Sequence, residues 1–204
     1  MKIKPSLFYE EQHQGIIAGL DEAGCGPWAG ALVAAAVILP STLPSYMCEI
    51  NDSKKLSRAK RESLYDRIVT DRSLIWSTGI VAVAELDILL LRKALPLAFE
   101  RAVEGLTIIP THLLIDGIRD PKLSFPTTLI KQGDQLSLSI AAASIIAKVT
   151  RDRLMDHLHD EFPAYGWNKN AGYGTKQHQD ALLVHGVTCH HRRSYAPIKA
   201  YLGV

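Results

Sequence analysis

The chain has 204 residues, of which 47% are hydrophobic and 22% charged, and its 23 Lys and Arg against 21 Asp and Glu give a formal net charge of +2. This composition is that of a globular α/β domain, and it argues against a disordered chain, a coiled coil and a protein that binds polyanions through bulk charge. Three cysteines without CxxC spacing argue against a disulfide framework and a zinc cluster.

No apolar run precedes Gly15, and the most apolar stretch, residues 29–39, is much shorter than the roughly 20 residues of a membrane helix. We therefore expect a cytoplasmic protein without a membrane partner, and a monomer.

The first half of the chain alternates between apolar runs and polar breaks. Ser57 is a suitable N-cap for a helix, and Pro96 should kink a second, longer helix. The predicted elements are strands at 15–20, 31–39 and 74–83 and helices at 57–71 and 85–104.

The second half continues the alternation and ends in a helical segment. Its predicted elements are strands at 112–115 and 127–131, helices at 137–161, 176–185 and 194–202, and a loop at 163–175. Such a pattern implies an α/β layer structure with a mixed sheet flanked by helices. We expect residues 1–162 to form the core and residues 163–204 a small helical cap.

Two predicted strands end in carboxylates, at Asp21-Glu22 and at Asp116. If these strands are neighbours, their acids converge, and clustered carboxylates suit Mg²⁺ or Mn²⁺. For any one acid the alternative is a solvated strand end. Adjacent residues on a strand also face opposite ways, so Asp21 and Glu22 can share a site only if the pleat breaks, which the glycines at 24 and 26 would allow.

Six stretches, in order, resemble the motifs of the type 2 ribonucleases H (ribonuclease HII). They are GLDEAGCGPWAGALVAAAVILP at 19–40, NDSKKLS at 51–57, LLIDG at 113–117, KQGDQLSLSIAAASIIAKVTRDRLM at 131–155, GYGTKQH at 172–178 and RRSYAP at 192–197. The resemblance runs from about residue 15 to 200, and six motifs in register are far more specific than one.

The resemblance implies a ribonuclease H-like fold and an endonuclease that hydrolyses the RNA strand of RNA–DNA hybrids and incises 5′ of ribonucleotides embedded in duplex DNA. It implies a two-metal mechanism with Mg²⁺ or Mn²⁺ that leaves 3′-hydroxyl and 5′-phosphate ends. By motif, Asp21, Glu22 and Asp116 resemble the family's metal ligands. Asp134 resembles the fourth acid, with Asp152 as the alternative.

The turn Gly24-Cys25-Gly26 resembles the family's Gly-Arg-Gly, in which peptide groups can read a 2′-hydroxyl. Cys25 replaces the arginine and removes a cation. If the backbone of the turn recognises the 2′-hydroxyl, specificity for a ribonucleotide should survive the replacement. If the family's arginine side chain is needed, recognition of the RNA–DNA junction is in doubt. Tyr173 resembles the tyrosine that stacks on a sugar beside the ribonucleotide.

Basic and polar groups form three further clusters that could contact phosphates. His178 could orient a loop or a phosphate. Taken singly, each cluster is more often a solvated surface. The predicted residues are Lys54 and Lys55; Ser144, Lys148 and Arg151, which share a helix face; and Arg192, Arg193 and Ser194.

Two other functions remain open. A module that binds hybrids without cutting them would explain Cys25, although all the acids are present. An α/β nucleotide-binding enzyme would need a phosphate-binding glycine loop, and GCGPWAG matches GxGxxG in spacing alone.

Overall fold

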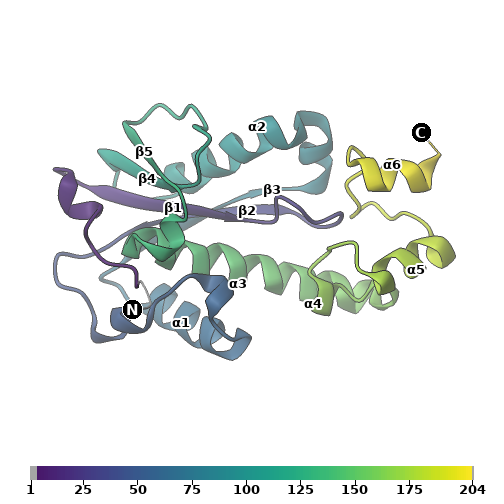
Figure 1. Ribbon diagram of the computed structural model, residues 1–204, viewed down its shortest axis with the longest axis horizontal. Helices are drawn as coiled ribbons and strands as arrows, with labels where there is room; N and C mark the ends of the chain where they lie inside the picture. Colours follow the sequence, from purple (N-terminus) through teal and green to yellow (C-terminus); the bar gives the residue numbers. More distant parts are fainter. Residues whose placement is uncertain (1–3, 204) are drawn as a thin grey trace.

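A mixed five-stranded sheet in the order β3-β2-β1-β4-β5 forms the centre of the computed structural model, which describes residues 4–203 (Figure 1). Central β1 runs antiparallel to β2 and parallel to β4. The strands are β1 Ile17–Ala23, β2 Leu32–Ile38, β3 Ile75–Val81, β4 His112–Asp116 and β5 Thr127–Ile130.

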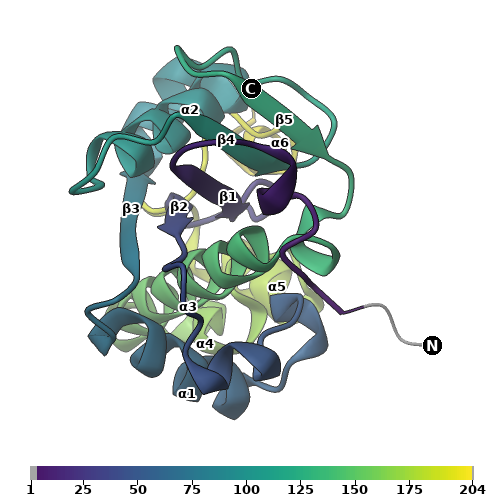
Figure 2. The same ribbon diagram turned by 90° about the vertical axis from the view of Figure 1, so that its left-hand side faces the viewer.

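Helices cover both faces of the sheet. Helix α2 (Val83–Glu104) lies on one face, and α3 (Leu138–Glu161) lies on the other with α1 (Arg58–Thr70) beyond it (Figures 1 and 2). All seven residues of β2 are buried, because α2 packs against one side of the strand and α3 against the other. The continuous apolar run in the sequence follows from this double coverage.

Gly19 lets α3 lie directly on β1. A Cβ atom at this position would come within 2.4 Å of the Ile140 backbone nitrogen. The absence of a side chain therefore brings the beginning of α3 beside the strand that carries Asp21 and Glu22.

The last 40 or so residues pack against the far end of α3 and the loop after β1. Trp167, Tyr165 and Ile198 share a core with Ala29 and Met155. The helices here are α4 Trp167–Asn170, α5 Lys176–His185 and α6 Ala196–Leu202.

The predicted mixed sheet flanked by helices is confirmed, and so are its five strands and long helices. Two local predictions are wrong. The break in α2 lies at Leu90 (φ 57°, ψ 161°) and not at Pro96. The positive φ at Leu90 separates two helical segments, and Pro96 lies inside the second of them. The predicted loop at 163–175 also contains a 3₁₀ turn, Pro163–Tyr165, and α4.

Within residues 4–203, no helix is both long and apolar enough to span a membrane.

Candidate active site

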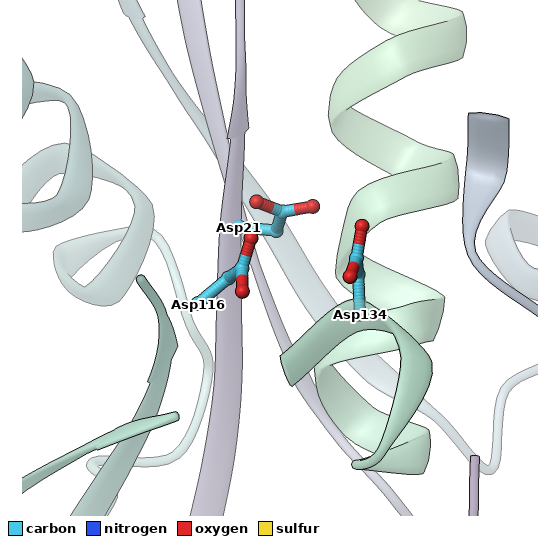
Figure 3. Close-up of side chains that lie close together, drawn as sticks. All are labelled: Asp21, Asp116 and Asp134. Carbon is cyan, nitrogen blue, oxygen red and sulfur yellow. The ribbon is translucent and has the colours of Figure 1, made fainter. Parts of the chain in front are cut away.

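Three aspartates from distant parts of the chain converge beside the sheet. Asp21, Asp116 and Asp134 each offer a carboxylate oxygen, and these oxygens lie within 4.8 Å of one another (Figure 3). Asp21 and Asp134 are buried, and Asp116 is half-buried.

The fold explains this convergence. Leu20 of β1 pairs with Ile115 of the parallel strand β4, so the acids that follow them lie side by side. Asp134 belongs to the 3₁₀ turn Gly133–Gln135 that precedes α3, and the backbone N–H of Gly133 donates to Asp116 Oδ1 at 2.7 Å. The N-cap of α3 is Ser137, so Asp134 is free of a capping role.

Burial and mutual repulsion make this cluster unfavourable without a counter-ion. Burial, followed by the charges of Glu22 and Asp116, raises the pKa of Asp21 well above its usual value. Burial, followed by the charge of Asp116, also raises the pKa of Asp134. Oxygens bound to one Mg²⁺ at about 2.1 Å are at most about 4.2 Å apart, so a small contraction of the cluster would accommodate a divalent ion. The donor set, made only of carboxylates, suits a hard cation.

Glu22 lies beside this cluster and lines the same pocket as Asp21. Pairing with β2 is regular through Ala23, so the predicted break in the pleat between Asp21 and Glu22 is absent, yet the two residues line one pocket at the end of the strand. The break follows at Gly24, where φ is +107°. The Glu22 carboxylate accepts a hydrogen bond from Cys25 Sγ at 3.5 Å, and its pKa is raised by burial.

Asp152 lies in an ion-pair cluster and not among the three aspartates. Its carboxylate is 2.6 Å from Lys148 Nζ and 3.9 Å from Arg61 Nη2. Of the two alternatives for the fourth acid, the structure therefore brings Asp134 to the site. Lys54 Nζ lies 3.3 Å from Asp134 Oδ2 and partly balances its charge.

A pocket of about 380 Å³ gathers most of the predicted site residues. The ring of Tyr173, half exposed, faces the glycine turn, since a Cβ atom at Gly26 would lie 3.4 Å from Tyr173 Cε1. The pocket is lined by Asp21, Glu22, Ala23, Gly24, Cys25, Gly26, Ser53, Lys54, Ser144, Lys148, Arg151 and Tyr173.

Two arginines that the sequence predicts at phosphates are instead buried and bind backbone carbonyls of the glycine turn or of the segment that follows it. Arg151 is 1% exposed and donates to the carbonyls of Ala29, Ala31 and Ala171. Arg192, fully buried, donates to carbonyls in the segment 25–31. Neither guanidinium is available to a substrate, because each is buried and already donates to backbone carbonyls.

Other predicted contacts also lie away from the pocket or are covered. His178 is fully buried and lies within hydrogen-bond distance of the Tyr173 carbonyl, which favours the predicted role in orienting the loop over a contact with phosphate. Ser144 lines the pocket but is buried and donates to Ala141. Lys55 Nζ donates to Gln135 Oε1. The backbone N–H groups of Arg193 and Ser194 both donate to the Asp87 carboxylate.

Asp52 was missed by the sequence analysis. It is 3% exposed and accepts hydrogen bonds from the Lys54 backbone and from Gln135 Nε2. It therefore joins the turn that carries Lys54 to the turn that carries Asp134. An Asp two residues before Lys54, followed by a short turn, is a capping signal that could have been read.

Comparison with known proteins adds an independent finding. The family model described as ribonuclease HII matches residues 18–198. The chain is 48% identical over 196 residues to a ribonuclease HII of Burkholderia pseudomallei (96% of this chain, 90% of the relative). It is 52% identical over 187 residues to that of Burkholderia cenocepacia (92% and 86%). The crystal structure of ribonuclease H2 from Pyrococcus horikoshii superposes with a TM-score of 0.77 at 25% identity, covering 92% of this chain and 97% of that one.

Proposed function

The chain belongs to the ribonuclease HII family and is a metal-dependent endonuclease for the RNA strand of RNA–DNA hybrids; we propose that it also incises duplex DNA on the 5′ side of an embedded ribonucleotide. The observation that supports the proposal most directly is the convergence of Asp21, Asp116 and Asp134 beside a pocket lined by the glycine turn and Tyr173.

We propose that Asp21, Glu22, Asp116 and Asp134 hold two Mg²⁺ or Mn²⁺ ions, with Asp134 rather than Asp152 as the fourth acid. When bound, such ions supply an activated water and stabilise the departing 3′-oxygen, so the products carry 3′-hydroxyl and 5′-phosphate ends. The hydrogen bond from Gly133 N–H keeps the Asp116 carboxylate turned toward the cluster before any ion arrives.

Recognition of the ribonucleotide is assigned to the turn Gly24-Cys25-Gly26. Its peptide groups can both donate to and accept from a 2′-hydroxyl, which DNA lacks. Arg192 donates to the Cys25 carbonyl within the turn, and Arg151 and Arg192 both donate to the Ala31 carbonyl in the segment that follows it. Because both arginines are buried, the turn meets the substrate in a fixed shape.

The residues around the turn position the rest of the nucleic acid. Tyr173 would stack on the neighbouring sugar or base, and Lys54 and Lys148 would contact phosphates. Tyr173 comes from residues 163–204, which we propose as a cap that contributes to substrate binding. The partners are accordingly the hybrid and the ribonucleotide-containing duplex.

Cleavage of an end-labelled DNA duplex with one internal ribonucleotide tests the proposal. We expect one incision, 5′ of the ribonucleotide, with Mg²⁺ or Mn²⁺ and none with EDTA. An all-DNA duplex is the control and should stay intact. Absence of incision with either metal, or cutting of the all-DNA control at the same rate, would contradict the proposal. Binding of the duplex without any turnover would favour the non-cutting binding module.

A further inference from the structure

Two buried histidines lie behind the loop that carries Tyr173. His178 of α5 and His191 are both fully buried, and their Nε2 atoms are 3.0 Å apart. His178 Nδ1 lies 2.9 Å from the carbonyl oxygen of Tyr173. His191 Nδ1 lies 3.0 Å from the backbone nitrogen of Thr188.

The Tyr173 carbonyl and the Thr188 backbone N–H, at the two ends of this hydrogen-bond chain, determine which ring nitrogens carry protons. A carbonyl can only accept, so His178 Nδ1 carries a proton and donates to Tyr173. A backbone N–H can only donate, so His191 Nδ1 is bare and accepts from Thr188 N–H. The Thr188 hydroxyl, which accepts from His190 N–H, lies 2.9 Å from the same nitrogen and can donate to it. The proton of neutral His191 is then on Nε2, and it points at the bare Nε2 of His178. Trp167 Nε1 donates to the same atom at 3.3 Å, which requires the same tautomer.

Each N–H in this arrangement points at an acceptor, with His191 Nε2–H and Trp167 Nε1–H sharing the single lone pair of His178 Nε2. A second proton on either ring would set two N–H groups against each other. Burial accordingly lowers the pKa of His178. Burial, with the neighbouring His178, lowers the pKa of His191 to about 3. Both rings therefore stay neutral, and the direction of the chain from Thr188 to Tyr173 is fixed.

We infer that His178 is a positioning residue that sets Tyr173 against the glycine turn for cleavage, and that His191 fixes the tautomer in which His178 does so. The inference rests on the proposed function of the pocket. Other bonds hold the neighbours of Tyr173: Trp28 N–H donates to Gly172, and Gln179 Nε2 donates to Gly174. Tyr173 itself makes two backbone hydrogen bonds: its N–H donates to the Asn170 carbonyl, and its carbonyl accepts from Thr175 N–H at 2.8 Å. His178 adds a side-chain hydrogen bond to the same carbonyl.

Isosteric substitutions separate this role from simple packing. In His178→Asn the side-chain nitrogen stands near the place of Nδ1 and can still donate to Tyr173, whereas in His178→Gln the nitrogen stands near Nε2 and cannot. We expect His178→Gln to lower kcat/KM for the single-ribonucleotide duplex about tenfold, close to the effect of Tyr173→Ala. His178→Asn should stay within about threefold of the wild type.

A double-mutant cycle provides the decisive comparison. If His178 acts through Tyr173, His178→Gln should change kcat/KM less than about twofold in the Tyr173→Ala background. An equal tenfold loss in both backgrounds, or no loss in the wild-type background, would overturn the inference. Circular dichroism and thermal melting of each variant identify any failure to fold.

The tautomers can be read in the unmodified protein and do not depend on how the variants fold. Long-range ¹H–¹⁵N spectra of the full chain labelled with ¹⁵N-histidine should show His178 protonated at Nδ1 and His191 at Nε2. A proton on Nε2 of His178 would overturn the inference. An inactive wild-type protein would overturn the proposed function instead, while the same spectra still decide the hydrogen-bond chain.

Discussion

Repulsion among the three aspartates should lower the free energy of unfolding of the metal-free protein. Asp134→Asn should remove part of this repulsion and raise that free energy. Asp134 is 3% exposed, and the substitution keeps its shape while removing its charge. The change should also remove one ligand of the divalent ions. The metal-free variant should therefore be more stable than the wild type, and the metal-loaded variant less stable.

The size of the effect follows from the geometry. Two full charges 4.8 Å apart repel by about 3 kcal/mol at an effective dielectric constant of about 20. The pair that Asp134 forms with Lys54, whose side chain is 75% exposed, contributes at most about 1 kcal/mol. Because the raised pKa values of Asp21 and Asp134 reduce the ionised fraction, we expect a net stabilisation of about 1–2 kcal/mol, or between about 2 and 8 °C in Tm.

Thermal melting with EDTA and with Mn²⁺ measures both parts. At a hundred times its Kd, Mn²⁺ should stabilise the wild type by about 2.7 kcal/mol and Asp134→Asn by much less. Asp152→Asn is the matched control, because it removes a carboxylate that is paired with Lys148 and lies outside the cluster. It should lower the stability by about 1–3 kcal/mol and keep the full response to Mn²⁺.

The stability order of Asp134→Asn and the wild type should thus invert when Mn²⁺ is added. An unchanged order, or a lost Mn²⁺ response in Asp152→Asn rather than in Asp134→Asn, would refute the assignment of the fourth acid.

Four further substitutions test other parts of the structure. Asp116→Asn should abolish turnover with the circular dichroism spectrum unchanged, and near-normal activity would remove it from the cluster's function. Tyr173→Ala should slow cleavage at single ribonucleotides about tenfold, and an unaltered rate would exclude stacking. Cys25→Arg should lower the substrate Kd and steepen its dependence on log salt by about 0.9; an identical salt slope would show that the side chain meets no phosphate. Gly19→Ala should destabilise the fold by more than about 2 kcal/mol, because its Cβ would lie 2.4 Å from the Ile140 nitrogen, and a wild-type Tm would contradict that packing.

Local patterns predicted much of the fold. Apolar runs marked the strands, and Ser57, the predicted N-cap, accepts a hydrogen bond from Lys60 N–H at the start of α1. Helix α5 begins and ends at the predicted residues, Lys176 and His185. These elements depend on neighbours in sequence, so the sequence alone contains the necessary information.

Features that depend on distant residues could not be predicted in this way. Arg151 and Arg192 had the pattern of phosphate contacts, but the carbonyls of Ala31 and Gly30 that accept from them lie more than 100 residues away in the chain. The role of His178 likewise needs His191 and the Tyr173 carbonyl in place. Burial of charge is set by tertiary packing, and composition cannot reveal it.

The most direct test of the central claim is a crystal soaked in Mn²⁺ and measured at a wavelength where manganese scatters anomalously. We predict an anomalous peak within about 2.3 Å of carboxylate oxygens of Asp21, Asp116 and Asp134, the three acids whose oxygens lie within 4.8 Å of one another. A peak bound to other residues, with none among these three aspartates at saturating Mn²⁺, would contradict the account.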